Sequence, residues 1–470
     1  MTAFLLLAAL ACLLPGQAHA GEPPFNVVFI DICSARADHF GAYGYGKRTT
    51  PGMDAVAKES VVFERAMAQS SWCLSNYASL FTGQPPEVHG LYAIARRKLP
   101  ESEATLAQKL KEAGYDTAAF SGGGTWLLPG WGLNKGFDRY EDIVSSSELL
   151  VPLAERAPQM LEWMRSRGKR PFFLYASVED LHLPYTADYV LTDDPELDSD
   201  RVPLESAGSK VALLREPGGK PLRSTDPSSP ESGVFHVRSE AQPELVAKYD
   251  SSLARADRQI SRFLGQLKAA GLWEKTVVVI AGDHGDQLGE HGITGHMEGL
   301  YEPVTHVPLI VHHPGFPQWT GKRIGELVER VDLMPTLLDV AGVPYEGLEL
   351  QSRSLLGLLR EPGRPWREYA FASSKRSINP ASDFILDERV VRTKRWKLHW
   401  YLHKGSFELY DLDKDPKELN DLSGKRPDIV ERLSFELLTH LELSRPHAPG
   451  LPSGKGSVEQ GPLLLPAPPD

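Results

Sequence analysis

The feature of this sequence that most limits its fold is a regular alternation between short apolar runs and longer amphipathic stretches. Five runs rich in β-branched or aromatic residues have the length of buried strands: 26–30, 117–120, 171–176, 276–281 and 307–311. Four stretches between and after them have helical periodicity: 103–113, 149–166, 245–270 and 331–341. Strands that alternate with helices are typical of a parallel sheet covered on both faces. We therefore expect an α/β fold with a large, mostly parallel central sheet sandwiched by helices.

The pattern changes after about residue 361. Residues 389–401 and 407–412 have the composition of antiparallel strands, and residues 427–443 that of a closing amphipathic helix. They predict a small C-terminal α+β subdomain over residues 362–445, which follows a larger domain over residues 21–361.

Two further segments have little periodicity. Residues 186–242 are rich in Asp, Pro, Ser and Gly, and we interpret them as an insertion over the active edge of the sheet. Residues 446–470 are rich in Pro and Gly and are predicted to be a disordered tail.

The N-terminus has the pattern of an export signal. Residues 1–20 contain no acidic or basic side chain and end in Ala18-His19-Ala20. The apolar run within them is shorter than the roughly 20 residues that span a bilayer. We predict a cleaved signal peptide, no stable membrane span and a periplasmic or secreted protein, with lipoprotein anchoring at Cys12 as the alternative. The net charge of −11, without basic blocks, argues against nucleic acid as a partner.

Polar residues stand just after three of the predicted strands. Asp31 follows the first strand, Asp283-His284 follows the run 276–281, and His182 lies beyond the run 171–176. In open α/β sheets, ligands bind at the carboxyl edge of the strands. Taken singly, each residue has an ordinary structural explanation, since Asp often caps a helix and His is often structural. Together, carboxylates and imidazoles at one edge suit a divalent cation.

Further motifs occur in an order that resembles the sulfatase family of the alkaline-phosphatase-like superfamily. The similar segments lie between Asn26 and Leu422, and they include residues 26–44, 50–51, 61–64, 72–83, 89–90, 276–302, 331–338 and 391–419. The segment 72–83 resembles the family's nucleophile motif and contains Cys73.

Carried over position by position, the resemblance implies four metal ligands: Asp31, Cys73, Asp283 and His284. Cys73 would also be the nucleophile, oxidised to formylglycine as in sulfatases. His182 and His296 would contact the oxyanion of the ester, and one of them would donate a proton to the leaving group. The metal would be one divalent ion, calcium rather than magnesium, which neutralises developing charge.

The chain departs from the family pattern at the nucleophile and at the first metal acid. Ser75 and Tyr77 stand where the maturation signal has Pro and Arg, and Asp31 lacks the second acid that many members have beside it. Cys33 lies at the same sheet edge as Asp31. Three states of Cys73 therefore remain open: formylglycine, a free thiol, or a disulfide with Cys33.

The leading hypothesis is an arylsulfatase-like hydrolase of sulfuric esters, metal-dependent, with Cys73 at the nucleophile position and a small-molecule or saccharide sulfate as substrate. One alternative is a hydrolase or transferase of phosphate or phosphonate esters on the same fold. The other is a catalytically degenerate binding protein. The sequence makes no prediction about oligomeric state.

Overall fold

The computed structural model describes thirteen segments of the chain: residues 25–93, 98–123, 126–142, 151–183, 185, 189–191, 201–203, 235–236, 242–296, 298–348, 350–361, 363–377 and 385–444. The predicted signal peptide, nearly all of the 186–242 insertion and the 446–470 tail lie outside these residues. None of the helices in the described segments is both long and apolar enough to cross a membrane.

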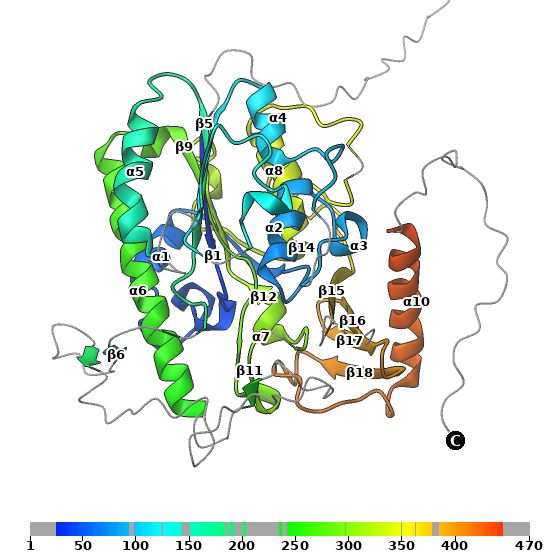
Figure 1. The fold of residues 1–470 in the computed structure, drawn as a ribbon. Coiled ribbons are helices and arrows are strands. Elements are labelled where there is room, and N and C mark those ends of the chain that lie inside the picture. Colours follow the sequence, from blue (N-terminus) through cyan, green and yellow to red (C-terminus); the bar gives the residue numbers. More distant parts are fainter. Residues whose placement is uncertain are drawn as a thin grey trace, which may run out of the picture.

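A nine-stranded sheet forms the centre of the molecule (Figure 1). Its strands run in the order β12-β2-β13-β9-β1-β5-β3-β4, and β14 pairs with β2. The neighbours β9, β1, β5, β3 and β4 are mutually parallel, whereas β13 is antiparallel to both β9 and β2. The bounds are β1 Asn26–Ile32, β2 Val61–Met67, β3 Asp116–Phe120, β4 Arg139–Glu141, β5 Phe172–Val178, β9 Thr276–Gly282, β12 His306–Val307, β13 Leu309–His312 and β14 Arg323–Glu329. The predicted α/β fold with a mostly parallel sheet is confirmed.

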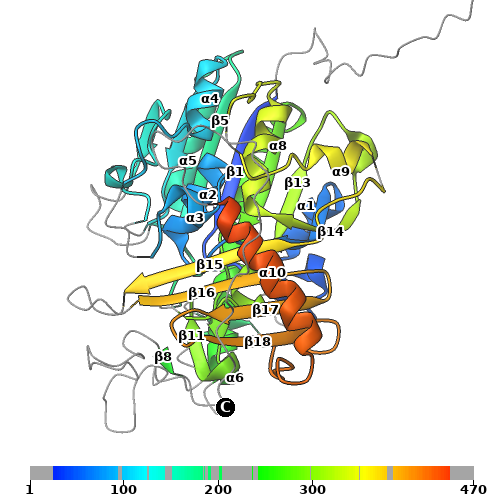
Figure 2. The same cartoon turned by 90° about the vertical axis from the view of Figure 1, so that its right-hand side faces the viewer.

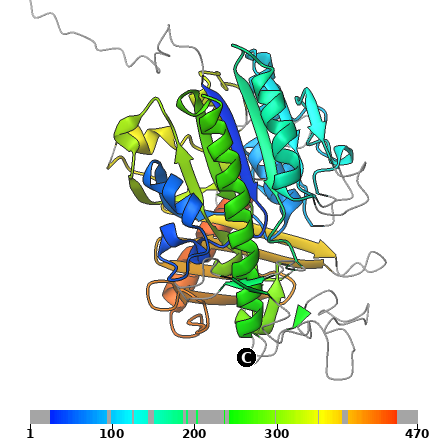
Figure 3. The ribbon, with the colours of Figure 1, turned by 90° about the vertical axis from the view of Figure 1, so that its left-hand side faces the viewer.

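Helices cover both faces of this sheet. One face packs against α1 (Pro51–Lys58), α5 (Leu153–Arg165) and α6 (Gln242–Ala269), and α6 runs down the whole face in Figure 3. The other face packs against α2 (Cys73–Thr82), α4 (Leu106–Glu112), α8 (Leu333–Val340) and α9 (Leu356–Arg360). Because both faces are covered, the central strands are apolar at nearly every position rather than at alternate ones.

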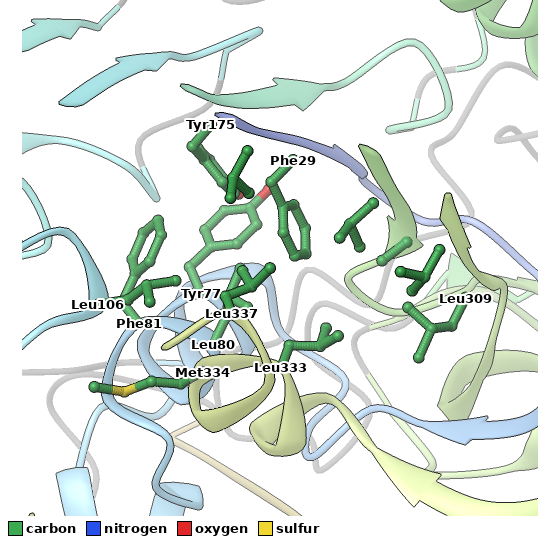
Figure 4. Packing of buried hydrophobic residues seen from close by; sticks show 14 of the residues in the cluster. Phe29, Tyr77, Leu80, Phe81, Leu106, Tyr175, Leu309, Leu333, Met334 and Leu337 are labelled. Atoms are coloured by element: carbon green, nitrogen blue, oxygen red, sulfur yellow. The ribbon is translucent and has the colours of Figure 1, made fainter. Parts of the chain in front are cut away.

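The core on the second face holds α2 firmly against the sheet. In Figure 4, Tyr77 of α2 points toward Phe29 of β1 and Tyr175 of β5. The rings of Tyr77 and Tyr175 lie 6.3 Å apart, and those of Phe29 and Tyr175 lie 5.8 Å apart. All ten residues of α2 are buried, so the helix is fixed along its entire length.

Two predicted strands are each divided in the structure. The run 307–311 is broken at Pro308 into β12 and β13, since proline has no N–H to donate to a ladder. The run 389–401 is two strands, β16 (Ile385–Arg392) and β17 (Trp396–Tyr401), because the chain reverses between Arg392 and Trp396.

The C-terminal part is a four-stranded antiparallel sheet in the order β15-β16-β17-β18, with α10 lying across one face (Figure 2). Its remaining elements are β15 (Ala370–Ser377), β18 (Ser406–Asp411) and α10 (Pro427–Leu443). The predicted closing helix is confirmed, whereas β15 was not predicted.

A buried charge network joins this sheet to the larger one. Glu302 of α7 (Glu302–Thr305) accepts two hydrogen bonds of 2.9 Å from Arg392 of β16. Lys397 of β17 donates to Glu302 at 3.1 Å and pairs with Glu418 at 3.3 Å. His399 and Glu418 lie 2.8 Å apart. Each charge is therefore paired within the network.

Stability in acid should depend on His89, which ends α3 (Pro86–His89). Its Nδ1 accepts from Leu91 N at 3.1 Å, and burial lowers its pKa to about 3 from 6.5. The unfolded chain binds this proton at pH values where the folded chain does not, so stability should fall as pH drops from about 6.5 to 3. Since each pKa unit is worth about 1.4 kcal/mol, the loss should be on the order of a few kcal/mol. Urea unfolding across this range should be flatter for His89→Asn than for the wild type; equal slopes would contradict the assignment.

Candidate functional site

Reactive side chains meet where three neighbouring strands end. Cys33 follows β1, Glu179 follows β5, and Asp283-His284 follows β9. Because β9, β1 and β5 are adjacent and parallel, these residues lie at one edge. Gly285 permits the close approach of the chain to Pro303, since a Cβ there would lie 2.1 Å from the carbonyl oxygen of Pro303.

Cys73 enters this edge from the opposite side, as the first residue of α2. Its Sγ is 3.1 Å from His284 Nε2 and 3.6 Å from Cys33 Sγ. Within the described part of the chain, Cys33 and Cys73 are both free, buried thiols. Burial raises the pKa of each thiol, so a nearby cation or base is needed to ionise them. The two sulfur atoms, which the sequence placed at one sheet edge, therefore lie side by side as thiols.

Two histidines stand beside Cys73, and their partners differ. His296 Nδ1 is 2.7 Å from the carboxylate of Asp286, which also accepts from Tyr185 at 2.8 Å. His182 Nδ1 donates to the carbonyl of Leu183 at 2.7 Å, and its buried Nε2 has no hydrogen-bond partner among the described residues. Burial lowers the pKa of His182, which favours its neutral form. One nitrogen of each histidine is therefore fixed, and the other is left for a ligand.

Aromatic rings flank the histidine pair on its partly exposed side. Trp126 stacks on His182 with ring centroids 5.8 Å apart, and Trp72 lies 5.6 Å from His296. The two tryptophans are 5.1 Å apart and both are half-buried. Apolar ring faces therefore lie directly beside the two imidazoles.

Asp31, which the sequence predicted as a metal ligand, is engaged elsewhere. Arg330 donates to both of its carboxylate oxygens, at 2.9 and 2.8 Å, and Tyr175 donates a third hydrogen bond at 3.0 Å. Asp31 and Arg330 are both fully buried. The strand continues one residue beyond Asp31, so Cys33 is the residue that projects from its end. The structure therefore does not bring Asp31 into the ligand group.

The sequence did not single out Arg330, Glu179, Asp286 or Tyr185. The hydroxyl of Tyr77 donates a hydrogen bond to Glu179 at 3.1 Å, and burial raises the pKa of Glu179 to about 8. Its signal was its position directly after a buried strand. Arg330 directly follows β14 and stands between Glu329 and Val331, so no local pattern marked it.

The remaining predicted ligands do form one group with Cys33. The ligand atoms of Cys33, Cys73, Asp283 and His284 all lie within 4.8 Å of one another. Asp283 Oδ1 accepts from Ser34 N and His284 N, whereas its buried Oδ2 has no hydrogen-bond partner among the described residues. His284 Nδ1 donates to Gly285 O at 2.9 Å, which turns the Nε2 lone pair toward Cys73. These orphaned acceptors fit a bound cation.

Comparison with known proteins bears on this geometry. The profile described as "Sulfatase" matches residues 25–343, which is more than half of the chain, and "N-sulphoglucosamine sulphohydrolase, C-terminal" matches residues 289–443. An arylsulfatase of Clostridium perfringens is 26% identical over 87% of this chain and 92% of its own. A Delta 4,5-hexuronate-2-O-sulfatase of Bacteroides thetaiotaomicron is 25% identical over 86% of this chain and 85% of its own.

Similarity of fold extends to a second class of enzyme. The crystal structure of a phosphonate monoester hydrolase of Agrobacterium radiobacter superposes with a TM-score of 0.67 at 21% identity, covering 90% of this chain and 96% of that one. The same family is indicated by the ordered motifs, by the two profile matches and by the shared architecture. The chain belongs to the sulfatase family and is a sulfatase-type ester hydrolase.

Proposed function

We propose that this protein is a metal-dependent hydrolase of sulfuric esters in which residue 73 attacks the ester. The observation that carries the proposal is the grouping of Cys73, His182 and His296, whose ligand atoms all lie within 4.8 Å of one another. A nucleophile position and two imidazoles at that spacing can contact the same sulfate group.

The different partners of the two histidines support different roles. Asp286 is a buried carboxylate beside His296 Nδ1, so it orients the ring, and His296 would donate the proton to the leaving oxygen. His182 has only a neutral carbonyl as its partner, so its Nε2 would accept a proton from water or from the attacking group. A divalent cation held by Cys73, Asp283 and His284 would supply positive charge that keeps residue 73 ionised.

The substrate would be a sulfate ester of a saccharide or of another small molecule with a flat or ring-shaped alcohol part. Trp72 and Trp126 offer half-buried ring faces beside the histidines, on which such a ring can pack. The relative from B. thetaiotaomicron is named for a sugar sulfate, which fits this substrate class. The leader-like composition of residues 1–20 supports a location in the periplasm or outside the cell.

An assay with matched aryl sulfate and aryl phosphate esters tests the proposal on the full-length protein. We expect a higher kcat/KM for the sulfate ester. A higher value for the phosphate ester would instead support the phosphate or phosphonate hydrolase, to which the shared fold gives some weight. No turnover of either ester by metal-loaded protein would contradict both.

Replacement of His296 by alanine should lower kcat for an aryl sulfate by about 10²–10⁴-fold, the usual contribution of a positioned acid. The loss should be smaller for esters with a more acidic alcohol, because such leaving groups need less protonation. His312→Gln is a matched control: His312 is also buried but pairs in register with Val278, five residues before Asp283. The role of His296 as the acid would be refuted if both variants lost kcat equally. It would also be refuted if the loss in His296→Ala did not depend on the acidity of the leaving alcohol.

A further inference from the structure

The side chains at the proposed cation site differ from those expected for calcium, the ion that the resemblance to sulfatases implies. Of the four converging side chains, two are thiols, one is an imidazole and one is a carboxylate: Cys33, Cys73, His284 and Asp283. All four are fully buried. Calcium takes six to eight oxygen ligands, and magnesium requires a near-ideal octahedron of oxygens. A single carboxylate among four donors therefore suits neither ion.

Asp31 does not add an oxygen ligand to this set. Asp31 is the nearest additional acid in the strand, but both of its oxygens are bound by Arg330. The guanidinium also donates to Gly282 O, which places it against the end of β9. Arg330 therefore supplies the positive charge that Asp31 would otherwise draw from a metal ion.

Three of the six distances between the donors are close to those around a tetrahedral ion. Zinc binds sulfur at about 2.3 Å and nitrogen or oxygen at about 2.0 Å, so tetrahedral ligand atoms are about 3.3–3.8 Å apart. Here the two sulfur atoms are 3.6 Å apart, Cys73 Sγ is 3.1 Å from His284 Nε2, and His284 Nε2 is 3.5 Å from Asp283 Oδ2. These edges need changes of only a few tenths of an ångström to enclose the ion.

The surrounding hydrogen bonds fix the same four donors. The carbonyl of Gly285 holds the proton of His284 on Nδ1, so Nε2 is the free ligand atom. Two backbone N–H groups hold Asp283 Oδ1 and leave Oδ2, which has no hydrogen-bond partner in the described residues, facing His284. Cys73 is held at the N-terminus of a fully buried helix. The ligands are thus positioned in advance of binding.

We propose that Cys33, Cys73, Asp283 and His284 form a two-thiolate tetrahedral site for a thiophilic divalent ion of the zinc class, in which Cys33 is a ligand and Asp31 is not. This inference rests on the proposed function only for the location of the site. A shell completed by four side chains leaves the ester to be bound by His182 and His296. Thiolate ligands select zinc over calcium and magnesium.

Metal content and cobalt spectroscopy test the site directly. The full-length protein, purified without chelator and dialysed against equimolar zinc and calcium, should retain about one zinc per chain and no calcium. Cobalt(II) in its place should show the strong visible bands of tetrahedral cobalt and a near-ultraviolet thiolate-to-cobalt transition. Cys33→Ser should weaken that transition and lower zinc affinity by more than about 100-fold, beyond the 10–100-fold expected for loss of an outer-shell partner.

Matched variants at positions 31 and 33 separate this site from the expected one. Asp31→Asn should leave the metal content unchanged, while Cys33→Asp should shift the selectivity toward calcium. The inference would be overturned by bound calcium in the wild type or by loss of metal in Asp31→Asn. It would also be overturned if mass spectrometry found a Cys33–Cys73 disulfide or formylglycine at residue 73. The sulfatase assay tests the proposed function separately. Activity with calcium bound would contradict the zinc site but not the hydrolase activity, whereas inactivity with zinc bound would contradict the hydrolase activity but not the zinc site.

Discussion

Replacement of Cys73 by alanine is expected to lower kcat/KM for a sulfate ester by at least about 10³-fold. The variant loses the attacking atom, while His182 and His296 remain. The site is buried and alanine is smaller than cysteine, so the fold should persist with modest destabilisation. Initial rates with an aryl sulfate, together with thermal unfolding of the same samples, give both quantities.

A second cysteine variant separates attack from metal binding. Cys33→Ala removes a proposed ligand but not the group at position 73, and the two sulfur atoms are only 3.6 Å apart. Its activity should recover as zinc is raised toward saturation, whereas Cys73→Ala should stay inactive at every zinc concentration. If both variants recover, Cys73 acts only as a ligand, and its role as the attacking residue is wrong.

Replacement of Arg330 by leucine should destabilise the protein by about 3–5 kcal/mol, because it leaves the Asp31 carboxylate buried and unpaired. Arg330 and Asp31 are 1% and 0% exposed, so water cannot take over the role of the lost guanidinium. Urea unfolding should report the change as a lower midpoint. Lys98→Met, which breaks an exposed pair with Glu101, should leave the midpoint where it is.

The partner substitution shows whether the loss comes from the uncompensated charge. Asp31→Asn keeps an oxygen for the hydroxyl of Tyr175 but removes the charge. Combined with Arg330→Leu, it should recover most of the lost stability, so the two single changes should not add. Additive losses would mean that Arg330 stabilises the fold through packing rather than through Asp31.

The α/β framework could be predicted from sequence because buried parallel strands are apolar at nearly every position. The run 276–281 is an example, and it corresponds to β9. The 17-residue helix α10 was found with its observed bounds because its apolar periodicity starts at a proline and is uninterrupted. By contrast, β15 was missed, since its residues Ala370–Ser377 are half polar and are defined by pairing with β16. Such pairing is non-local and leaves little trace in the strand itself.

The site was only partly predictable, for a similar reason. Asp283, His284 and His296 were identified because local motifs carry them. Cys33 was noted at the same edge as Asp31, and Asp31 was predicted as the ligand, since both residues project toward the same face of β1 and only their distance along the strand differs. The deciding contact is between Asp31 and Arg330, which are 299 positions apart. No local pattern could have revealed that pairing.

The network around Glu302 bears on how this protein could be divided. Residues 289–343 fall within both matched profiles, and Glu302 lies in that shared stretch. Its carboxylate is held by Arg392 and Lys397, which come from the C-terminal sheet. A fragment ending near residue 361 would retain the anion and lose both cations, so it would not be an autonomous folding unit. The two parts of the chain are therefore expected to fold as one unit, so the boundary predicted from the sequence is not a point at which the chain can be cut.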